Sequence, residues 1–147
     1  MQFNKQKSSK HAGFTLLEIM VVVVILGVLA SMIVPNLLGN KEKADRQKVI
    51  SDIVALENAL DMYKLDNNSY PTTDQGLDAL LTKPSGEPAP RNYPDDGYIK
   101  RLPQDPWGND YILYSPGEHG KVDISSVGQD GEEDTDDDIG NWTLGAK

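Results

Sequence analysis

The chain has 147 residues, enough for one modest domain, and a formal net charge of −9. Its first 13 residues contain three lysines and no acid, so they carry +3 and leave −12 for the rest. The acidic body excludes nucleic acid as a partner because it repels phosphates, and the absence of cysteine excludes disulfides, thiol catalysis and cysteine-based metal sites.

An apolar run begins shortly after the lysines. It extends from Phe14 to Val34 and is interrupted by only three polar side chains, Thr15, Glu18 and Ser31. As a helix, this stretch would rise about 30 Å, roughly the thickness of the hydrocarbon core of a bilayer. Because the lysines precede the run, the positive-inside rule predicts a single span with the body of the chain on the outer side.

A second interpretation of the same run is a cleaved secretory signal, for which Val28-Leu29-Ala30 is an acceptable cleavage site. Such signals have a shorter apolar core, whereas this run continues through Met32, Ile33 and Val34. The pattern favours a retained helix. A lipid anchor on the leader is excluded because the chain has no cysteine.

Glu18 places a carboxylate inside the apolar run. Such a charge costs about 2.5–3.5 kcal/mol near a bilayer centre and less near its edge. In an isolated monomer the carboxylate could lie at the interface and reach water. Alternatively, cleavage after Gly13 would give Phe14 a free amine in the same membrane layer, and this amine, from the same or a neighbouring chain, would pair with Glu18.

The segment from Lys10 to Glu18, with the sequence KHAGFTLLE, resembles the class III signal of type IV pilins and pseudopilins. This resemblance implies that residues 1–13 are a leader. It also implies that a prepilin peptidase cuts between Gly13 and Phe14 and that the new N-terminus at Phe14 is methylated.

The same resemblance makes Glu18 the residue that directs assembly. It implies that residues 14–35 form a transmembrane and assembly helix, which crosses the inner membrane once in contact with its lipid. Residues 36–147 would then form a pseudopilin domain in the periplasm.

Beyond the apolar run, the helical pattern continues and predicts one long helix from Phe14 to Leu65. Five apolar residues, spaced by four, three, four and three, mark the buried face of its second half: Val49, Ile53, Leu56, Leu60 and Tyr63. Pro35 lacks an amide hydrogen and predicts a kink or local melting, either as an adjustable point in an assembly or simply as a bend at the membrane boundary.

The rest of the chain predicts a small antiparallel sheet. Thr73 is expected to cap a short helix over Asp74–Leu81, and the proline-rich residues 84–97 are expected to form a loop. Two strands, Asp110–Ser115 and Lys121–Val127, would form a hairpin. The predicted fold class is therefore α+β and type IV pilin-like, with the long N-terminal helix packed on the sheet.

The segment Gly128–Asp138 carries seven carboxylates within nine residues. Their mutual repulsion is relieved either by a solvated, disordered loop or by a bound hard cation such as calcium, and the segment does not match the EF-hand pattern. Burial of Trp142 after this loop would hold its ends together and favour the cation.

Three C-terminal motifs resemble the major pseudopilin subfamily, the G component of type II secretion: DPWGN at 105–109, SVGQDG at 126–131 and DDIGNW at 137–142. The resemblance implies that the loop over residues 127–138 binds Ca²⁺. The implied ligands are the side chains of Asp130, Asp137 and Asp138 and the carbonyls of Val127 and Glu132. Further loop acids could substitute for them: Glu132, Glu133, Asp134 and Asp136.

Other polar residues show no catalytic arrangement, and the sequence predicts that the protein is not an enzyme. His119 is expected to be solvated in the hairpin turn. Glu57 and Asp61, four apart on the helix, are expected to face water or else to bridge to Lys100 or Arg101 of a neighbour.

Together these features predict the major subunit of a periplasmic pseudopilus, a homopolymer that helps drive folded exoproteins through an outer-membrane secretin. The resemblance implies minor pseudopilins, the prepilin peptidase and an inner-membrane assembly platform as partners, with a separate ATPase as the energy source. One alternative is a type IV pilin proper, against which the lack of a cysteine loop argues. Another is a monomeric, membrane-anchored domain that binds its partner in a calcium-dependent manner.

Overall fold

The computed structural model describes the backbone of residues 13–144 and the side chains of residues 13–31 and 39–144. Residues 1–12 of the predicted leader therefore lie outside the described residues. The chain divides into two compact units, with the boundary between Asn40 and Lys41.

One long helix, α1, runs from Leu16 to Asn67 and confirms the predicted helix, with each end two residues further along the chain. At the N-terminus, Thr15 stands at the cap position, and its carbonyl and hydroxyl oxygens accept the amide of Glu18 at 3.1 and 3.3 Å. The backbone remains helical through Pro35, so the local melting predicted there is absent from the described backbone.

Among the described residues, no helix combines the length and the apolar character that crossing a membrane requires. The single span over residues 14–35 stays a prediction, and the side chains of residues 32–35 lie outside the described residues.

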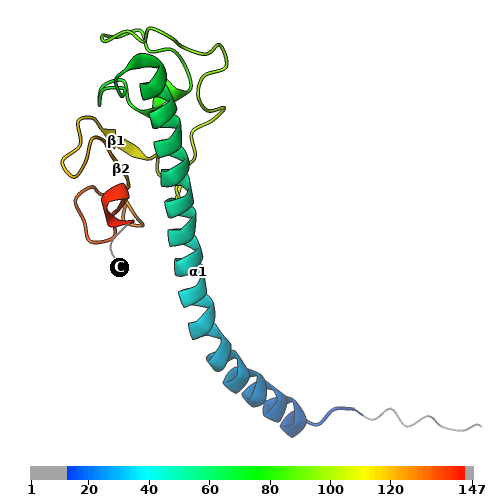
Figure 1. The fold of residues 1–147 in the computed structure, drawn as a ribbon. Helices are drawn as coiled ribbons and strands as arrows, with labels where there is room; N and C mark the ends of the chain where they lie inside the picture. Colours follow the sequence, from blue (N-terminus) through cyan, green and yellow to red (C-terminus); the bar gives the residue numbers. More distant parts are fainter. Residues whose placement is uncertain (1–12, 145–147) are drawn as a thin grey trace, which may run out of the picture. The chain divides into compact units, whose positions relative to one another are not determined.

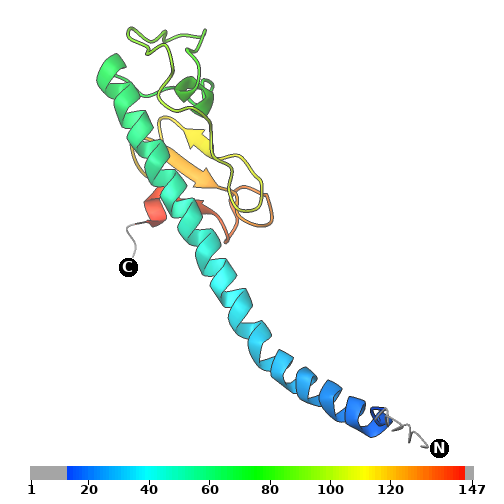
Figure 2. The same ribbon diagram turned by 90° about the vertical axis from the view of Figure 1, so that its right-hand side faces the viewer.

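The second half of α1 forms the base of the C-terminal unit. The five side chains of its predicted apolar face are at most 2% exposed, which confirms the prediction: Val49, Ile53, Leu56, Leu60 and Tyr63. They belong to one hydrophobic cluster with residues of the sheet, among them Leu113, Ile124 and Ile139. Figures 1 and 2 show the strands lying along this part of the helix.

Three short antiparallel strands form the sheet in the order β1-β2-β3. The strands β1 (Ile112–Tyr114) and β2 (Asp123–Ser126) confirm the predicted hairpin but are shorter than expected. In their register, Leu113 pairs with Ile124. The third strand, β3 (Ile139–Gly140), was not predicted, because a two-residue strand has no hydrophobic period that a sequence could reveal.

The predicted helix over Asp74–Leu81 is wrong in its first half. Residues 73–76 form a turn, and only the 3₁₀ helix η1 (Leu77–Leu80) follows. Gly76 lies at φ +60°, a left-handed conformation that interrupts helical geometry. Thr73 therefore does not cap a helix. Its hydroxyl instead accepts the amide of Ser115 at 2.8 Å, at the end of the β1 strand.

We expect Leu60→Ala to destabilise the C-terminal unit by about 2–5 kcal/mol, because Leu60 is fully buried and its loss leaves a cavity. Leu65→Ala is the matched control, since Leu65 lies on the same helix and is 80% exposed. Urea unfolding followed by circular dichroism would measure both. Equal unfolding midpoints for the two variants would contradict the core described above.

Candidate functional site

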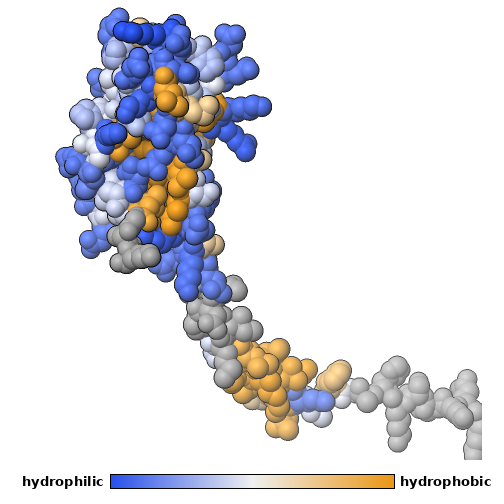
Figure 3. Space-filling model, in the orientation of Figure 1, coloured by the Kyte–Doolittle hydropathy of each residue, from blue (hydrophilic) through white to orange (hydrophobic). Residues whose placement is uncertain are grey.

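The N-terminal end of α1 presents an apolar surface around a single acid. Phe14 precedes the helix and is 79% exposed, and every large apolar side chain from Phe14 to Leu29 is at least 48% exposed. Figure 3 shows this surface as an orange segment. A helix that exposes apolar side chains on all sides needs lipid or other helices around it.

Glu18 lies in the first turn of α1, where the positive end of the helix dipole stabilises its negative charge. Thr15 and Glu18 also have the spacing of a capping box, in which the glutamate side chain reaches back toward the cap residue. The described structure thus supplies a local reason for an acid at this position. Any test of an assembly role must separate the charge of Glu18 from its capping ability.

The acidic loop is closed by one of its own carboxylates. Oδ2 of Asp137 accepts the amides of Gln129 at 2.6 Å and Asp130 at 3.2 Å, so the end of the loop is tied to its beginning. A hydrogen bond from the Thr135 hydroxyl, then those from the amides of Asp130 and Gln129, hold the pKa of the Asp137 carboxyl below its usual value.

Gly128 makes this closure feasible. It lies at φ +67°, and a Cβ atom there would come within 2.4 Å of Oδ2 of Asp137. Any other residue would push the Asp137 carboxylate away from the amides that it accepts. A steric requirement within the loop therefore explains why the SVGQDG motif has a glycine at position 128.

The predicted ligands lie on the same loop, and those of Glu132, Asp137 and Asp138 all lie near the Thr135 hydroxyl. Asp138 accepts the amides of Asp134 and Thr135, and Asp130 accepts the amide of Glu132. The Thr135 hydroxyl donates to the carbonyl of Glu132 at 3.3 Å. Val127 is buried directly after β2.

The donor set of the loop suits a hard cation, because it consists of carboxylate and carbonyl oxygens. Its present side-chain arrangement is set by backbone amides instead. In the described part of the chain, no three acidic or histidine side chains form a group that could hold a metal ion. Asp130 and Asp138 each accept these amides with one carboxylate oxygen, so the other oxygen remains for a cation.

A second set of contacts, which no local pattern of the sequence predicts, anchors the start of the loop. Asp105 is buried, and its carboxylate accepts the Ser126 hydroxyl at 2.6 Å and the amides of Trp107 and Asn109. The side chain of Asn109 in turn donates to the carbonyl of Gly128 at 3.0 Å. Asp105 and Asn109 of the DPWGN motif therefore fix the base of the loop. In the sequence, only the resemblance of this motif to a known subfamily marked these residues.

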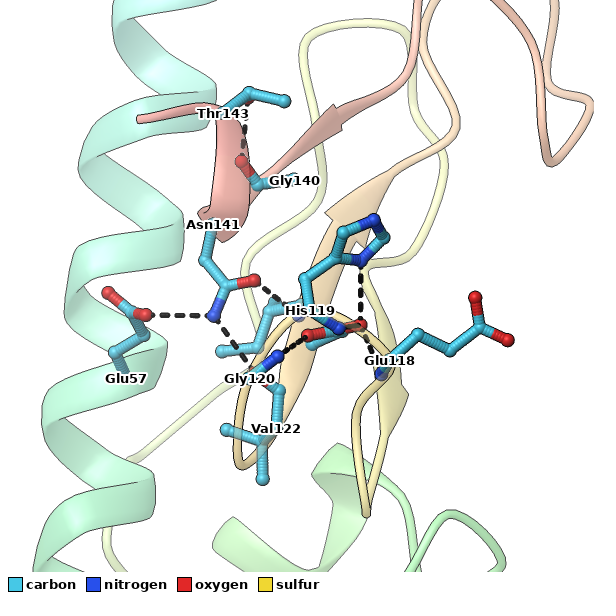
Figure 4. A network of polar contacts seen from close by, with 10 residues as sticks. Glu57, Glu118, His119, Gly120, Val122, Gly140, Asn141 and Thr143 are labelled. Atoms are coloured by element: carbon cyan, nitrogen blue, oxygen red, sulfur yellow. Dashed lines mark hydrogen bonds and ion pairs between the residues drawn. The ribbon is translucent and has the colours of Figure 1, made fainter. Parts of the chain in front are cut away.

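The hairpin turn is organised around Asp123, which is only 4% exposed. Its carboxylate accepts the amides of Glu118, His119 and Gly120, and Nδ1 of His119 lies 3.0 Å from its Oδ2 (Figure 4). Burial raises the pKa of the Asp123 carboxyl, but the hydrogen bonds from His119 and Glu118 outweigh burial and leave this pKa below its usual value.

The condition under which Trp142 would favour the cation is not met, and the prediction that His119 is merely solvated is wrong. Trp142 is not buried, since it is 38% exposed, and it does not hold the loop by burial. His119 is not merely solvated, because its ring stacks on that of Trp142 with centroids 4.2 Å apart and an interplanar angle of 9°. The stacked pair joins the C-terminal segment to the hairpin turn, a contact between residues too distant in sequence to be predicted.

The two helix acids have partners within the chain, Glu57 is only partly exposed, and Asp61 is exposed to water as expected. Asn141 donates to Glu57 at 2.9 Å and to the carbonyl of Val122 at 3.1 Å (Figure 4). Tyr70 donates to Asp61 at 2.7 Å, and this hydrogen bond, together with burial, raises the pKa of the Tyr70 hydroxyl to about 12.

Comparison with known families gives two adjoining matches. The family described as type II secretion system (T2SS), protein G, matches residues 36–142. The prokaryotic N-terminal methylation motif matches residues 8–34, which include the predicted cleavage site.

The chain is also similar over most of its length to individual proteins. It is 75% identical to type II secretion system core protein G of Klebsiella michiganensis, covering 96% of this chain and 99% of that protein. It is 67% identical to the core protein G of Escherichia coli K12, covering 95% and 97%. The crystal structure of the major pseudopilin from the type 2 secretion system of enterohaemorrhagic E. coli matches with a TM-score of 0.71 and 68% identity, covering 75% of this chain and 96% of that chain.

We expect Asp123→Asn to destabilise the protein by about 1–3 kcal/mol near neutral pH, because an amide NH₂ would face backbone donors that now have a carboxylate acceptor. The folded-state pKa of Asp123 is lowered, so its stabilisation is complete above the ordinary value of 3.8 and is lost as the pH falls below it.

The difference between wild type and Asp123→Asn should therefore shrink in acid. Chemical denaturation at several pH values would measure it, with the exposed Asp74 changed to Asn as control. A difference that stays constant down to strongly acidic pH would show that the Asp123 charge does not stabilise the turn.

Proposed function

We infer the function of this chain from its family: it belongs to the type II secretion system protein G family and is a structural subunit of the pseudopilus. We propose that copies of the chain polymerise into a periplasmic fibre whose growth helps drive folded exoproteins through an outer-membrane secretin. The observation that carries this proposal is the N-terminal methylation motif over residues 8–34, which includes the exposed apolar start of α1.

The proposed route to the fibre follows from the chemistry of residues 13–18. The prepilin peptidase would cut between Gly13 and Phe14 and leave a methylated amine on Phe14. The retained apolar helix would hold the subunit in the inner membrane by a single pass, with the C-terminal domain in the periplasm. There the inner-membrane assembly platform and the minor pseudopilins would add it to the polymer.

Glu18 would then serve as the register residue for assembly. Its carboxylate would pair with the Phe14 amine of a neighbouring chain, since an acid among apolar helices is stable only with a nearby cation. The family is a structural one, and we propose no catalytic step for this chain.

We further propose that the loop over residues 127–138 binds Ca²⁺. The ligands would be the side chains of Asp130, Asp137 and Asp138 and the carbonyls of Val127 and Glu132. Three features support this proposal: an oxygen-only donor set, a loop base fixed by Asp105 and Asn109, and loop ends already joined through Asp137. The cation would stabilise the folded loop and take no part in chemistry.

For assembly, we expect mature protein from cells to begin at Phe14 by mass spectrometry, and both Glu18→Ala and Glu18→Gln to abolish polymers while the domain stays folded. Glutamine retains the capping ability of glutamate but not its charge, so the pair separates the two roles. Glu42→Ala, an exposed acid on the same helix, is the control.

Polymers recovered from cells by shearing or crosslinking would give the readout for assembly. Normal polymers from Glu18→Gln would mean that Glu18 acts only as a capping residue. A chain that works unchanged as a monomer would favour the membrane-anchored binding domain instead.

For the loop, we expect calcium to raise the free energy of unfolding of the wild-type chain by about 2.7 kcal/mol when free calcium is 100 times its Kd. Asp137→Asn should lose most of this calcium-dependent increment, whatever its stability without the metal. Asp95→Asn, an exposed acid outside the loop, should keep it. Calorimetric scans with calcium, with magnesium and with chelator would check this. If calcium does not raise the unfolding temperature of the wild-type chain, the metal proposal is wrong.

A further inference from the structure

A pocket of about 320 Å³ lies in the C-terminal unit, between the hairpin turn, the acidic loop and the C-terminal segment. No described residue of α1 lines this pocket. Figure 4 shows Glu118 and His119 extending from the hairpin turn on the side away from α1. We call it the hairpin pocket and define it by six of its lining residues: Tyr114, Glu118, His119, Ser125, Glu133 and Trp142.

The walls of the hairpin pocket are aromatic and open to solvent. Tyr114 is 42% exposed and Trp142 is 38% exposed, and the ring of His119 stacks on that of Trp142. Aromatic rings attract cations through the negative charge over their faces, and the planar guanidinium of arginine also stacks on them. Exposed rings that share one pocket therefore suit a flat cation.

The lining of the pocket has the charge that such a cation needs. Among the described residues, no lysine or arginine lines the pocket, whereas five carboxylates do: Glu118, Asp123, Glu133, Asp134 and Asp138. A cavity with this lining attracts cations and repels anions. Only Asp138 is also one of the ligands proposed for Ca²⁺, so the pocket differs from the proposed calcium site.

Ser125 adds a buried hydroxyl without a partner. It is 9% exposed and lies two residues after Asp123 in β2, on the same face of the strand, and both residues line the pocket. The Ser126 hydroxyl donates to Asp105, but the Ser125 hydroxyl forms no hydrogen bond with a described residue. Because no fully enclosed side-chain polar atom in the described part of the chain lacks a partner, this hydroxyl is reached through the pocket.

We propose that the hairpin pocket binds an arginine side chain of a different, basic protein. A guanidinium has five N–H donors in one plane, so it can donate to the Ser125 hydroxyl and to carboxylates of the pocket while its face lies on an aromatic ring. A second copy of this chain is a poor source, because residues 14–147 carry −12 and contain only three arginines. The inference goes beyond polymerisation and does not depend on it.

The first test uses the full chain in a non-ionic detergent, labelled with fluorotryptophan and followed by fluorine NMR. The chain has two tryptophans, and Trp107→Phe assigns their signals. The peptide acetyl-Gly-Arg-Gly-amide should shift the Trp142 signal to saturation and leave the Trp107 signal in place. The same peptide with citrulline, which has the shape of arginine without its charge, should bind at least about tenfold more weakly.

Substitutions in the pocket test its polar groups. Glu118→Gln combined with Glu133→Gln should weaken the arginine peptide at least about tenfold, and Ser125→Ala should weaken it several-fold. The matched control combines Glu42→Gln with Glu87→Gln, which removes the same charge from exposed positions outside the pocket. Because Glu118 and Glu133 are exposed, the unfolding midpoint of their double variant should equal that of the control.

The binding experiments can overturn the inference in three ways. One is equal binding of the arginine and citrulline peptides. Another is equal binding of the arginine peptide by the double variant and by its control. The third is loss of this binding when calcium is in excess, because the acids would then serve the metal alone. None of these outcomes depends on polymers, so the proposed function is tested separately.

The source of the arginine is tested in cells. A photo-crosslinking amino acid at Glu118 should join the chain to a different protein, and mass spectrometry of the joined peptides should place the link beside an arginine of that protein. Adding Glu133→Gln should lower the yield of this product several-fold. Crosslinks that join only copies of this chain, or links that lie away from any arginine, would overturn the proposal.

Discussion

The C-terminal unit depends on the burial of one face of α1. Three strands of two to four residues cannot form a stable sheet by themselves, so they need a packed surface behind them. The apolar face from Val49 to Tyr63 supplies that surface, and β2 lies at the centre with Ile124 fully buried. Every other feature of the unit, including the acidic loop, is attached to this helix-sheet contact.

The acidic loop shows how a chain can fold against its own charge. Repulsion among seven carboxylates opposes a compact loop, yet several of them accept backbone amides within it. The buried Asp105 and the side chain of Asn109 fix the point at which the loop leaves the sheet. A cation would act on a loop whose ends are already joined, so the ordering entropy lost on binding would be smaller.

The C-terminal segment is held by contacts of a different kind. Asn141 joins it to the helix through Glu57 and to the hairpin through Val122, and Trp142 stacks on His119. These polar and aromatic contacts lie near the surface and connect elements far apart in sequence. The long helix thus supports the core with one face and holds the C-terminal segment through Glu57.

The sequence by itself determined the helix, its buried face, the hairpin, the family resemblance and the acidic loop, because periodicity, turn residues and charge runs are local properties. The backbone conformation of the structure was required to locate the ends of α1, the break at Gly76 and the strand β3. The anchoring role of Asp105, the stacking of His119 on Trp142 and the contact of Glu57 with Asn141 were decided only by the tertiary structure. Each joins residues whose separation in the chain says nothing of their distance in space, and a single sequence does not encode such pairs in any local pattern.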